Sequence, residues 1–210
     1  ISGTKDEGSE WIRHDDSLDP SLTIDMPEFD EKNEAPETTY YKLWKEGTTE
    51  PEELELTGAG EESNNLFGTI SELDGVWNLK YYTMDNAGNR SPNEDSYSET
   101  IKIDLTKPGV KLKNIRTETS NAPQIIKRLF GNFFNDKLIV EFEVSDETSK
   151  IKSFEYRIGK DGNFTSADVE SGATETSALY SFEIPLETYG KEVYLRAADN
   201  AGNIYEDVLK

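Results

Sequence analysis

The sequence predicts an all-β chain that folds as two tandem antiparallel β-sandwich domains. The pentapeptide Asp-Asn-Ala-Gly-Asn occurs at residues 85–89 and returns unchanged at 199–203, each time directly after a strand-like run. Residues that favour strands, such as Thr, Tyr, Val, Ile and Phe, are plentiful, whereas methionine occurs only twice. Short apolar runs are separated by turn-forming clusters and no helix pattern is convincing, which is typical of a sandwich.

A second landmark precedes each pentapeptide at nearly the same spacing. Tyr-Tyr-Lys-Leu-Trp-Lys-Glu-Gly at 40–47 aligns with Glu-Tyr-Arg-Ile-Gly-Lys-Asp-Gly at 155–162. Two landmarks in the same order indicate two copies of one domain. We therefore predict domains at 1–106 and 107–210, each near the commonest domain size.

Alternating apolar and polar residues predict the strands of the first domain. Candidate strands, in chain order, are 10–13, 21–26, 39–45, 53–57, 66–70, 76–85 and 97–104. The segment 105–109 forms the joint between domains, where Pro108 restricts the backbone and favours an end-to-end, semi-rigid arrangement.

The second domain shows a similar series of strands. We expect them at 110–113, 137–146, 152–159, 180–186, 191–199 and 204–209. Between the first two lies an apolar segment, 121–134, with a possible helical turn beginning at Asn121. It is interpreted as a connection covering one end of the sandwich, with an exposed contact patch as the alternative.

Acidic residues dominate the charge, and they are concentrated in the first domain. Residues 1–106 contain 8 basic and 26 acidic residues, whereas 107–210 contain 14 and 17. This balance argues against nucleic acid as a partner, because binding phosphates requires Lys and Arg. It predicts a well-solvated surface, with a cation-rich environment as the sharper alternative. No apolar run approaches 18 residues, so no direct membrane insertion is expected.

The sequence offers little for catalysis. Cysteine is absent and His14 is the single histidine, which excludes thiolate sites, His-based metal clusters and a conventional triad. Paired carboxylates are available by count, but a sandwich of this size offers little cleft, so we expect no enzyme. The opening Ile-Ser-Gly-Thr lacks a signal-peptide pattern, and we expect a fragment of a longer protein.

The repeated pentapeptide has two interpretations. As a turn it needs Asn and Gly, which tolerate positive φ, and an Asp side chain that bonds nearby backbone N–H groups. As a calcium site its oxygen ligands are suitable, but one carboxylate, Asp85 or Asp199, is too few unless Asp104, Asp146 or a loop acid converges on it. The turn is favoured, so no metal or other cofactor is assigned, and calcium stays possible.

The same pattern resembles the bacterial immunoglobulin-like (Big-type) tandem repeats of cell-surface and secreted proteins. The resemblance lies in the Tyr-containing strand, the Gly-led strand, the pentapeptide, and the run Phe-Gly-Asn-Phe-Phe-Asn-Asp at 130–136 before a strong strand. It covers most of 107–210 and the later two-thirds of 1–106, but not the acidic opening 38 residues. It implies immunoglobulin-like sandwiches in series on an exported bacterial polypeptide, with neighbouring repeats as partners and an extracellular or cell-surface location.

Aligning the repeats also predicts which residues face outward. Tyr41, Leu43, Leu79, Tyr81 and Thr83 should point inward, as should Tyr156, Ile158, Val193, Leu195 and Ala197 in the second copy. The outward set in the first domain then includes Lys42 and Lys80 together with Tyr40, Trp44 and Tyr82. The last three form an aromatic patch suited to a glycan or host protein. Alternatively, the opening segment with its Trp11 covers Trp44.

Three functions follow as expectations. The first is a non-catalytic structural or spacer module of a bacterial surface or secreted protein, such as an adhesin in the cell wall. The second is a glycan- or protein-binding module that uses Tyr40, Trp44 and Tyr82. The third is a stalk stiffened by calcium at Asp85 and Asp199.

Overall fold

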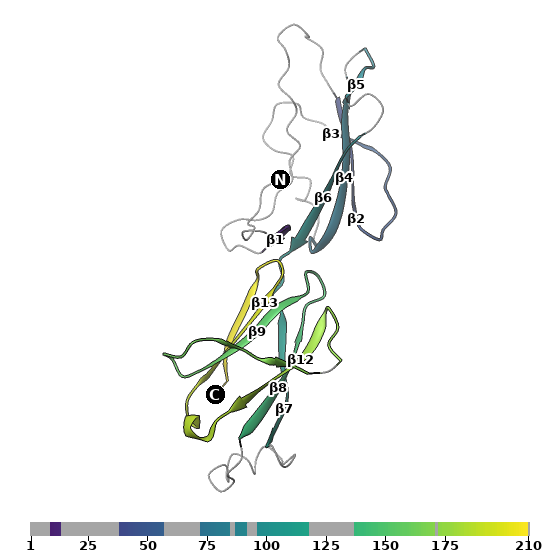
Figure 1. The fold of residues 1–210 in the computed structure, drawn as a ribbon. Helices are drawn as coiled ribbons and strands as arrows, with labels where there is room; N and C mark the ends of the chain where they lie inside the picture. Colours follow the sequence, from purple (N-terminus) through teal and green to yellow (C-terminus); the bar gives the residue numbers. More distant parts are fainter. Residues whose placement is uncertain are drawn as a thin grey trace. The chain divides into compact units, whose positions relative to one another are not determined.

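The chain folds as two compact units, Ile1–Leu105 and Thr106–Lys210. The computed structural model describes residues 9–13, 38–56, 72–84, 87–91, 96–117, 137–170 and 172–209. Within these ranges the regular structure is all-β apart from one short 3₁₀ helix, which confirms the predicted all-β class (Figure 1). No helix in the described part of the chain is long and apolar enough to cross a membrane.

The first unit contains a six-stranded sheet. Its main strands run in the order β1-β6-β4-β2-β3, and β5 pairs with β4. The strands are β1 (Trp11–Arg13), β2 (Thr38–Lys45), β3 (Leu54–Leu56), β4 (Gly75–Met84), β5 (Arg90–Ser91) and β6 (Tyr97–Asp104). The predicted strands 21–26 and 66–70 lie outside the described residues.

One face of this sheet forms the core of the unit, as the alternation of side chains predicts. Its buried cluster consists of Ile12, Trp77, Leu79, Ile101 and Ile103. The predicted inward residues Tyr41, Leu43 and Tyr81 pack against that cluster. Trp77 is 8% exposed, and its indole N–H donates to the carbonyl of Leu73 at 2.8 Å, so the ring is buried without an unmet donor.

The short strand β1 joins this core through a parallel pairing. Trp11, Ile12 and Arg13 lie opposite Lys102, Ile103 and Asp104 of β6. Ile12 is only 1% exposed. The predicted strand at 10–13 is thus present as β1, at the edge of the sheet beside β6.

The second unit consists of two four-stranded sheets with the orders β10-β9-β13-β14 and β11-β12-β8-β7. The elements are β7 (Gly109–Thr117), β8 (Leu138–Ser145), β9 (Ile151–Ile158), β10 (Thr165–Ser166), β11 (Asp168–Val169), β12 (Ser177–Ile184), the 3₁₀ helix η1 (Leu186–Thr188), β13 (Val193–Asp199) and β14 (Ile204–Leu209). The apolar segment 121–134 falls almost wholly within 118–136, which the structure does not describe.

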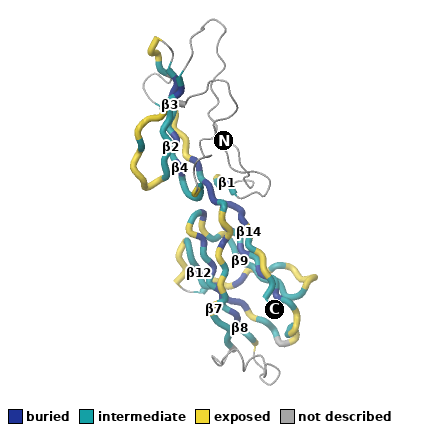
Figure 2. Tube along the Cα trace, turned by 180° about the vertical axis from the view of Figure 1, so that it is seen from behind, coloured by how far each residue is buried: buried dark blue, intermediate teal, exposed yellow. Residues whose placement is uncertain are grey.

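Both sheets of the second unit contribute to one hydrophobic core. Phe142 of β8 contacts Phe154 of β9 and Phe182 of β12, with ring centroids 5.5 and 5.9 Å apart. The predicted inward residues Val193, Leu195 and Ala197 are all buried in this core. Figure 2 shows buried residues alternating with more exposed ones along the strands. Two sheets around a shared core are consistent with the predicted β-sandwich.

In the second unit the chain passes from one sheet to the other within five residues, 165–169. Thr165 and Ser166 pair with β9, whereas Asp168 and Val169 pair with β12. Ala167 lies between them and is 8% exposed, so the crossing point belongs to the core. The sequence predicts no strand here, because two-residue pairings leave no periodic pattern to detect.

Candidate functional site

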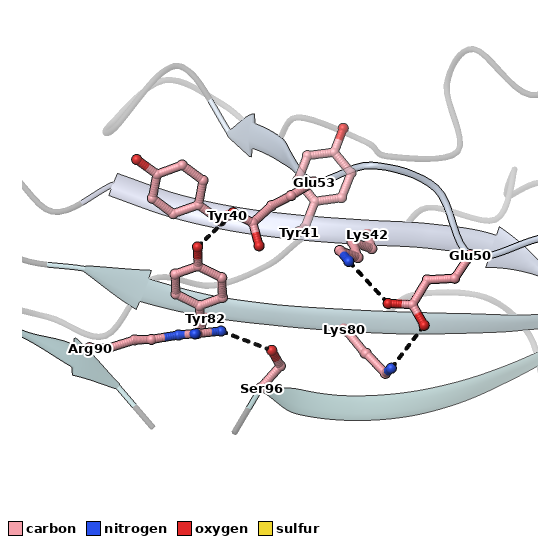
Figure 3. A pocket seen from close by; sticks show the side chains of 9 residues that line it. All are labelled: Tyr40, Tyr41, Lys42, Glu50, Glu53, Lys80, Tyr82, Arg90 and Ser96. Carbon is pink, nitrogen blue, oxygen red and sulfur yellow. Dashed lines mark hydrogen bonds and ion pairs between the residues drawn. The ribbon is translucent and has the colours of Figure 1, made fainter. Parts of the chain in front are cut away.

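The outward face of β2 and β4 carries the predicted aromatic residues. In the register of these strands Tyr40 lies opposite Tyr82, and Lys42 lies opposite Lys80. The rings of Tyr40 and Tyr82 are stacked, with centroids 5.1 Å apart and planes inclined by 20° (Figure 3). The predicted alternation thus places two of the three predicted binding residues, Tyr40 and Tyr82, in direct contact.

Trp44 lies on the same strand but further along. It is four residues from Tyr40, or about 13 Å at the rise of an extended strand. It is opposite Asn78, is partly buried, and has the Lys80 Nζ atom 5.4 Å from its ring centroid. Trp44 therefore forms a cation–π contact with Lys80, away from the stacked rings of Tyr40 and Tyr82. Whether the opening segment covers it involves residues outside the described part.

A polar pocket with a volume of about 160 Å³ lies over this face. Figure 3 shows its lining, which consists of Tyr40, Tyr41, Lys42, Glu50, Glu53, Lys80, Tyr82, Arg90 and Ser96. Sequence analysis placed Lys42 and Lys80 on the outward face, but it missed Glu50, Glu53, Arg90 and Ser96. Those four lie outside β2 and β4, on connections or on the short strand β5, where alternation gives no signal.

Glu50 forms ion pairs with both lysines of the pocket. Its carboxylate accepts from Lys42 Nζ at 3.1 Å and from Lys80 Nζ at 3.0 Å. These hydrogen bonds, the one from Lys80 first, lower the pKa of Glu50. The pocket therefore already contains a carboxylate bound between two ammonium groups.

Tyr82 is the most enclosed aromatic residue of the pocket, being 9% exposed. Its hydroxyl donates to Glu53 at 2.6 Å, and the Arg90 guanidinium carbon lies 3.5 Å from its ring centroid. Burial and then the hydrogen bond to Glu53 raise the pKa of Tyr82 to about 12. The ring is thus engaged by Tyr40 and Arg90, and Tyr40, which is partly exposed, is the tyrosine available to a ligand.

The equivalent face of the second unit is built differently. Arg196 forms an ion pair with Glu155 at 2.6 Å, in the positions that align with Tyr82 and Tyr40. The guanidinium carbons of Arg157 and Arg196 lie 4.8 and 4.2 Å from the ring centroid of Phe164. Phe164 therefore packs against Arg157 and Arg196 in the second unit, whereas Glu50 forms ion pairs with Lys42 and Lys80 in the first.

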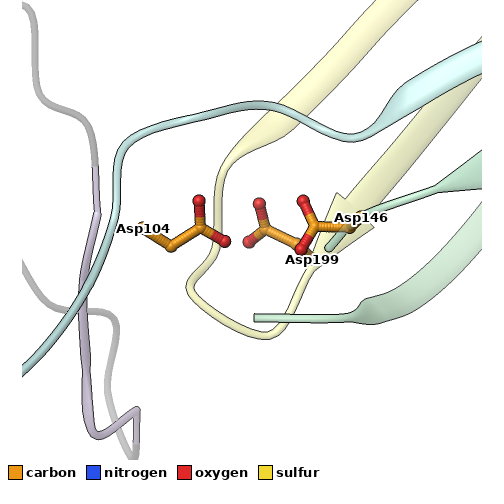
Figure 4. Close-up of side chains that lie close together, drawn as sticks. All are labelled: Asp104, Asp146 and Asp199. Carbon is orange, nitrogen blue, oxygen red and sulfur yellow. The ribbon is translucent and has the colours of Figure 1, made fainter. Parts of the chain in front are cut away.

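A second candidate is a pair of aspartates at strand ends of the second unit (Figure 4). Asp146 follows β8, and Asp199 ends β13. A carboxylate oxygen of Asp146 lies within 4.8 Å of a carboxylate oxygen of Asp199. Asp146 is 5% exposed and Asp199 is 0% exposed, so both carboxylates are shielded from bulk water.

The turns around Asp146 and Asp199 fix their carboxylates. Asp146 Oδ1 accepts the backbone N–H groups of Ser149 at 2.9 Å and Lys150 at 2.8 Å. Asp199 Oδ1 accepts those of Gly202 at 2.7 Å and Asn203 at 2.8 Å. The second copy of the pentapeptide, at 199–203, therefore forms the predicted turn, and Gly202 adopts the positive φ of 96° that the turn requires.

These two carboxylates are the residues that could hold a metal in the described part of the second unit. Like charges this close repel one another, and burial raises the cost of each charge. A divalent cation removes that repulsion, and an all-oxygen donor set with carboxylates suits calcium. Sequence analysis named Asp104, Asp146 or a loop acid as the group that would have to join Asp199. Asp146 lies beside it, Asp104 belongs to the first unit, and Asp85 and His14 lie outside the described residues.

Comparisons with known proteins assign no family to this chain. No protein-family model matches it, and no curated protein matches it. The functional argument therefore depends on the residues themselves.

Proposed function

We propose that this chain is a non-catalytic structural module of a bacterial surface or secreted protein, in which two immunoglobulin-like units act in series as a spacer. The observation that carries the proposal is that each unit has a hydrophobic core of its own. Units with separate cores can be repeated along a polypeptide without sharing side chains. The resemblance to Big-type repeats supports the bacterial, extracellular setting, with neighbouring repeats as partners.

The second function is calcium-dependent stiffening of this spacer. It is favoured by one specific observation in the second unit, the burial of Asp146 and Asp199 with carboxylate oxygens within 4.8 Å of each other. A calcium ion that binds only the folded chain would stabilise it by mass action. The site would involve Asp199 but differs from a site built on the pentapeptide alone, because its second carboxylate, that of Asp146, comes from the end of β8.

Single-molecule stretching of the full chain between its ends tests the structural role. Each unit has about 105 residues, which extend to roughly 350 Å when unfolded. We expect two separate unfolding events, each lengthening the chain by about that amount less the folded length. Millimolar calcium should raise the force of at least one event.

Two other outcomes would each refute one of these two roles. A single event for the whole chain would show that the units do not unfold independently and would refute the spacer of separate modules. Two events whose forces are the same in calcium and in EDTA would refute calcium stiffening while leaving the spacer intact.

A further inference from the structure

Basic residues are unexpectedly concentrated at the pocket over β2 and β4. Residues 1–106 contain only 8 basic residues against 26 acidic ones. Three of the eight, Lys42, Lys80 and Arg90, line this single pocket. In a unit with such an excess of acid, three cations in one small pocket favour an anionic group as its occupant.

Glu50 shows which anionic group fits. Its carboxylate bridges Lys42 and Lys80 at 3.1 and 3.0 Å, as a ligand carboxylate would. Glu50 belongs to the exposed connection between β2 and β3, so it can leave without disturbing the sheet. It is therefore an internal competitor for the place of a ligand carboxylate.

Arg90 adds donor capacity that the protein does not use. One terminal nitrogen donates to Ser96 at 3.3 Å. Its Nε atom is buried and has no hydrogen-bond partner in the described part of the chain. A buried donor without a partner is costly, and a shift of the Arg90 side chain toward a ligand oxygen would satisfy it.

Glu53, which also lines the pocket, favours a ligand that carries hydroxyl donors. Glu53 is an acceptor that faces the pocket beside the Tyr82 hydroxyl. An ionised carboxylate can only accept hydrogen bonds, so a ligand next to it must bring donors. An acidic amino-acid side chain offers a carboxylate without hydroxyls, whereas an acidic sugar offers both.

We propose that this pocket binds the carboxylate-bearing terminal sugar of a glycan, with Lys42, Lys80 and Arg90 facing its carboxylate in the place of Glu50. Glu53 and the tyrosine hydroxyls then bond its ring hydroxyls, and Tyr40 lies along the ring. This binding is separate from the structural role and requires no calcium.

Size and charge restrict the ligand further. The volume of about 160 Å³ is below the roughly 300–1,000 Å³ of pockets for drug-sized ligands, so it fits one sugar residue. The net charge of the chain is −21, which repels polyanions. At physiological salt, charges beyond about 8 Å are largely screened. The preferred ligand is therefore a glycan whose sugars are uncharged except for one acidic sugar at its end.

Titration calorimetry of the full chain with two matched trisaccharides tests this. The probes are lactose capped with glucuronic acid and lactose capped with glucose, which differ in the one carboxylate. We expect the acidic probe to bind about tenfold or more tightly, because it makes charge-assisted contacts that its neutral twin lacks. Lys80→Gln should weaken its binding about fivefold.

Two further variants separate a binding role from a structural one. Glu50→Gln removes the internal competitor and should strengthen binding of the acidic probe, a gain that loss of folding cannot imitate. Lys113→Gln is the control, because Lys113 and Glu143 form an ion pair at 3.2 Å with similar exposure elsewhere in the chain. It should leave binding unchanged.

Equal affinity for both trisaccharides, or no binding of either, would overturn the proposal. Binding that is weakened by Glu50→Gln would also overturn it, because Glu50 would then be part of the recognition surface. If a short glutamate-containing peptide binds and the acidic trisaccharide does not, the pocket recognises peptides and the sugar assignment is wrong.

Discussion

Replacing Asp146 with asparagine should change the stability of the folded chain in opposite directions with and without calcium. Without calcium, the substitution removes one of two buried carboxylates of the second unit, those of Asp146 and Asp199, whose oxygens lie within 4.8 Å of each other. Asparagine keeps the side-chain oxygen that accepts the N–H groups of Ser149 and Lys150. With calcium, the same substitution removes a charged ligand.

The magnitude follows from the spacing. At 4.8 Å and an effective dielectric constant of about 20, two unit charges repel by about 3 kcal/mol. Removing one of the two charges therefore removes a repulsion of about 3 kcal/mol. Weaker hydrogen bonds to a neutral side chain offset about 1–2 kcal/mol of this. The repulsion is the larger effect, so the calcium-free variant should be more stable than the calcium-free wild type.

Calcium reverses the order. At a concentration one hundred times Kd, one bound ion stabilises the wild type by about 2.7 kcal/mol. For a unit of this size that corresponds to an increase in Tm of roughly 10 °C. The variant should gain much less, because calcium affinity depends on the number of charged ligands.

Thermal unfolding followed by circular dichroism, in 1 mM EDTA and in 5 mM calcium at pH 7.5, measures all four values. Asp161→Asn is the matched control, because it removes an exposed carboxylate away from the Asp146–Asp199 pair and should not alter the calcium response. If the wild type melts at the same temperature in both buffers, Asp146 and Asp199 do not bind calcium. If calcium stabilises the variant as much as the wild type, Asp146 is not a ligand.

Three further outcomes test the energetics of the fold. Since the pKa of Tyr82 is raised to about 12, its ionisation favours the unfolded chain above pH 10. The free energy of unfolding should therefore fall between pH 10 and 12, and it should fall less steeply in Tyr82→Phe. Phe154 is 1% exposed, and Phe154→Ala should cost about 3–5 kcal/mol by urea denaturation; a loss below 1 kcal/mol would contradict the core assignment. Gly88 has a φ of 83° with nothing near its missing Cβ, so Gly88→Ala should cost about 1–2 kcal/mol from backbone strain alone, and an unchanged denaturation midpoint would contradict that.

Sequence periodicity predicted the strands whose two faces differ in environment. Leu43 and Leu79 point to the core of the first unit while Lys42 and Lys80 point outward, and that contrast is visible as alternation. The same reasoning missed β10 and β11, which are two residues long. A pairing that short depends on its neighbours in the fold, which a local pattern cannot record.

The pocket was only half predictable for a related reason. Alternation along β2 and β4 placed Tyr40 beside Tyr82, because antiparallel register follows from the inward residues. Arg90 reaches Tyr82 from β5, and Glu50 reaches the lysines from a connection. Connections have no side-chain period, so the charged half of the pocket emerges only once the chain is folded.

The turn and the metal site, which the sequence leaves as alternatives for the pentapeptide, are compatible in the structure. Asp199 Oδ1 accepts two backbone N–H groups, and Oδ2 accepts the side-chain amide of Asn203 at 2.9 Å. These bonds hold the carboxylate in a fixed orientation before any cation arrives. Asp146 is held by its own turn in the same way. Since an ion then orders little additional structure, the turn lowers the entropic cost of binding at this pair of carboxylates. Asp199 would therefore serve calcium binding because it forms the turn, and a variant that loosens the turn should weaken calcium binding even when both carboxylates remain.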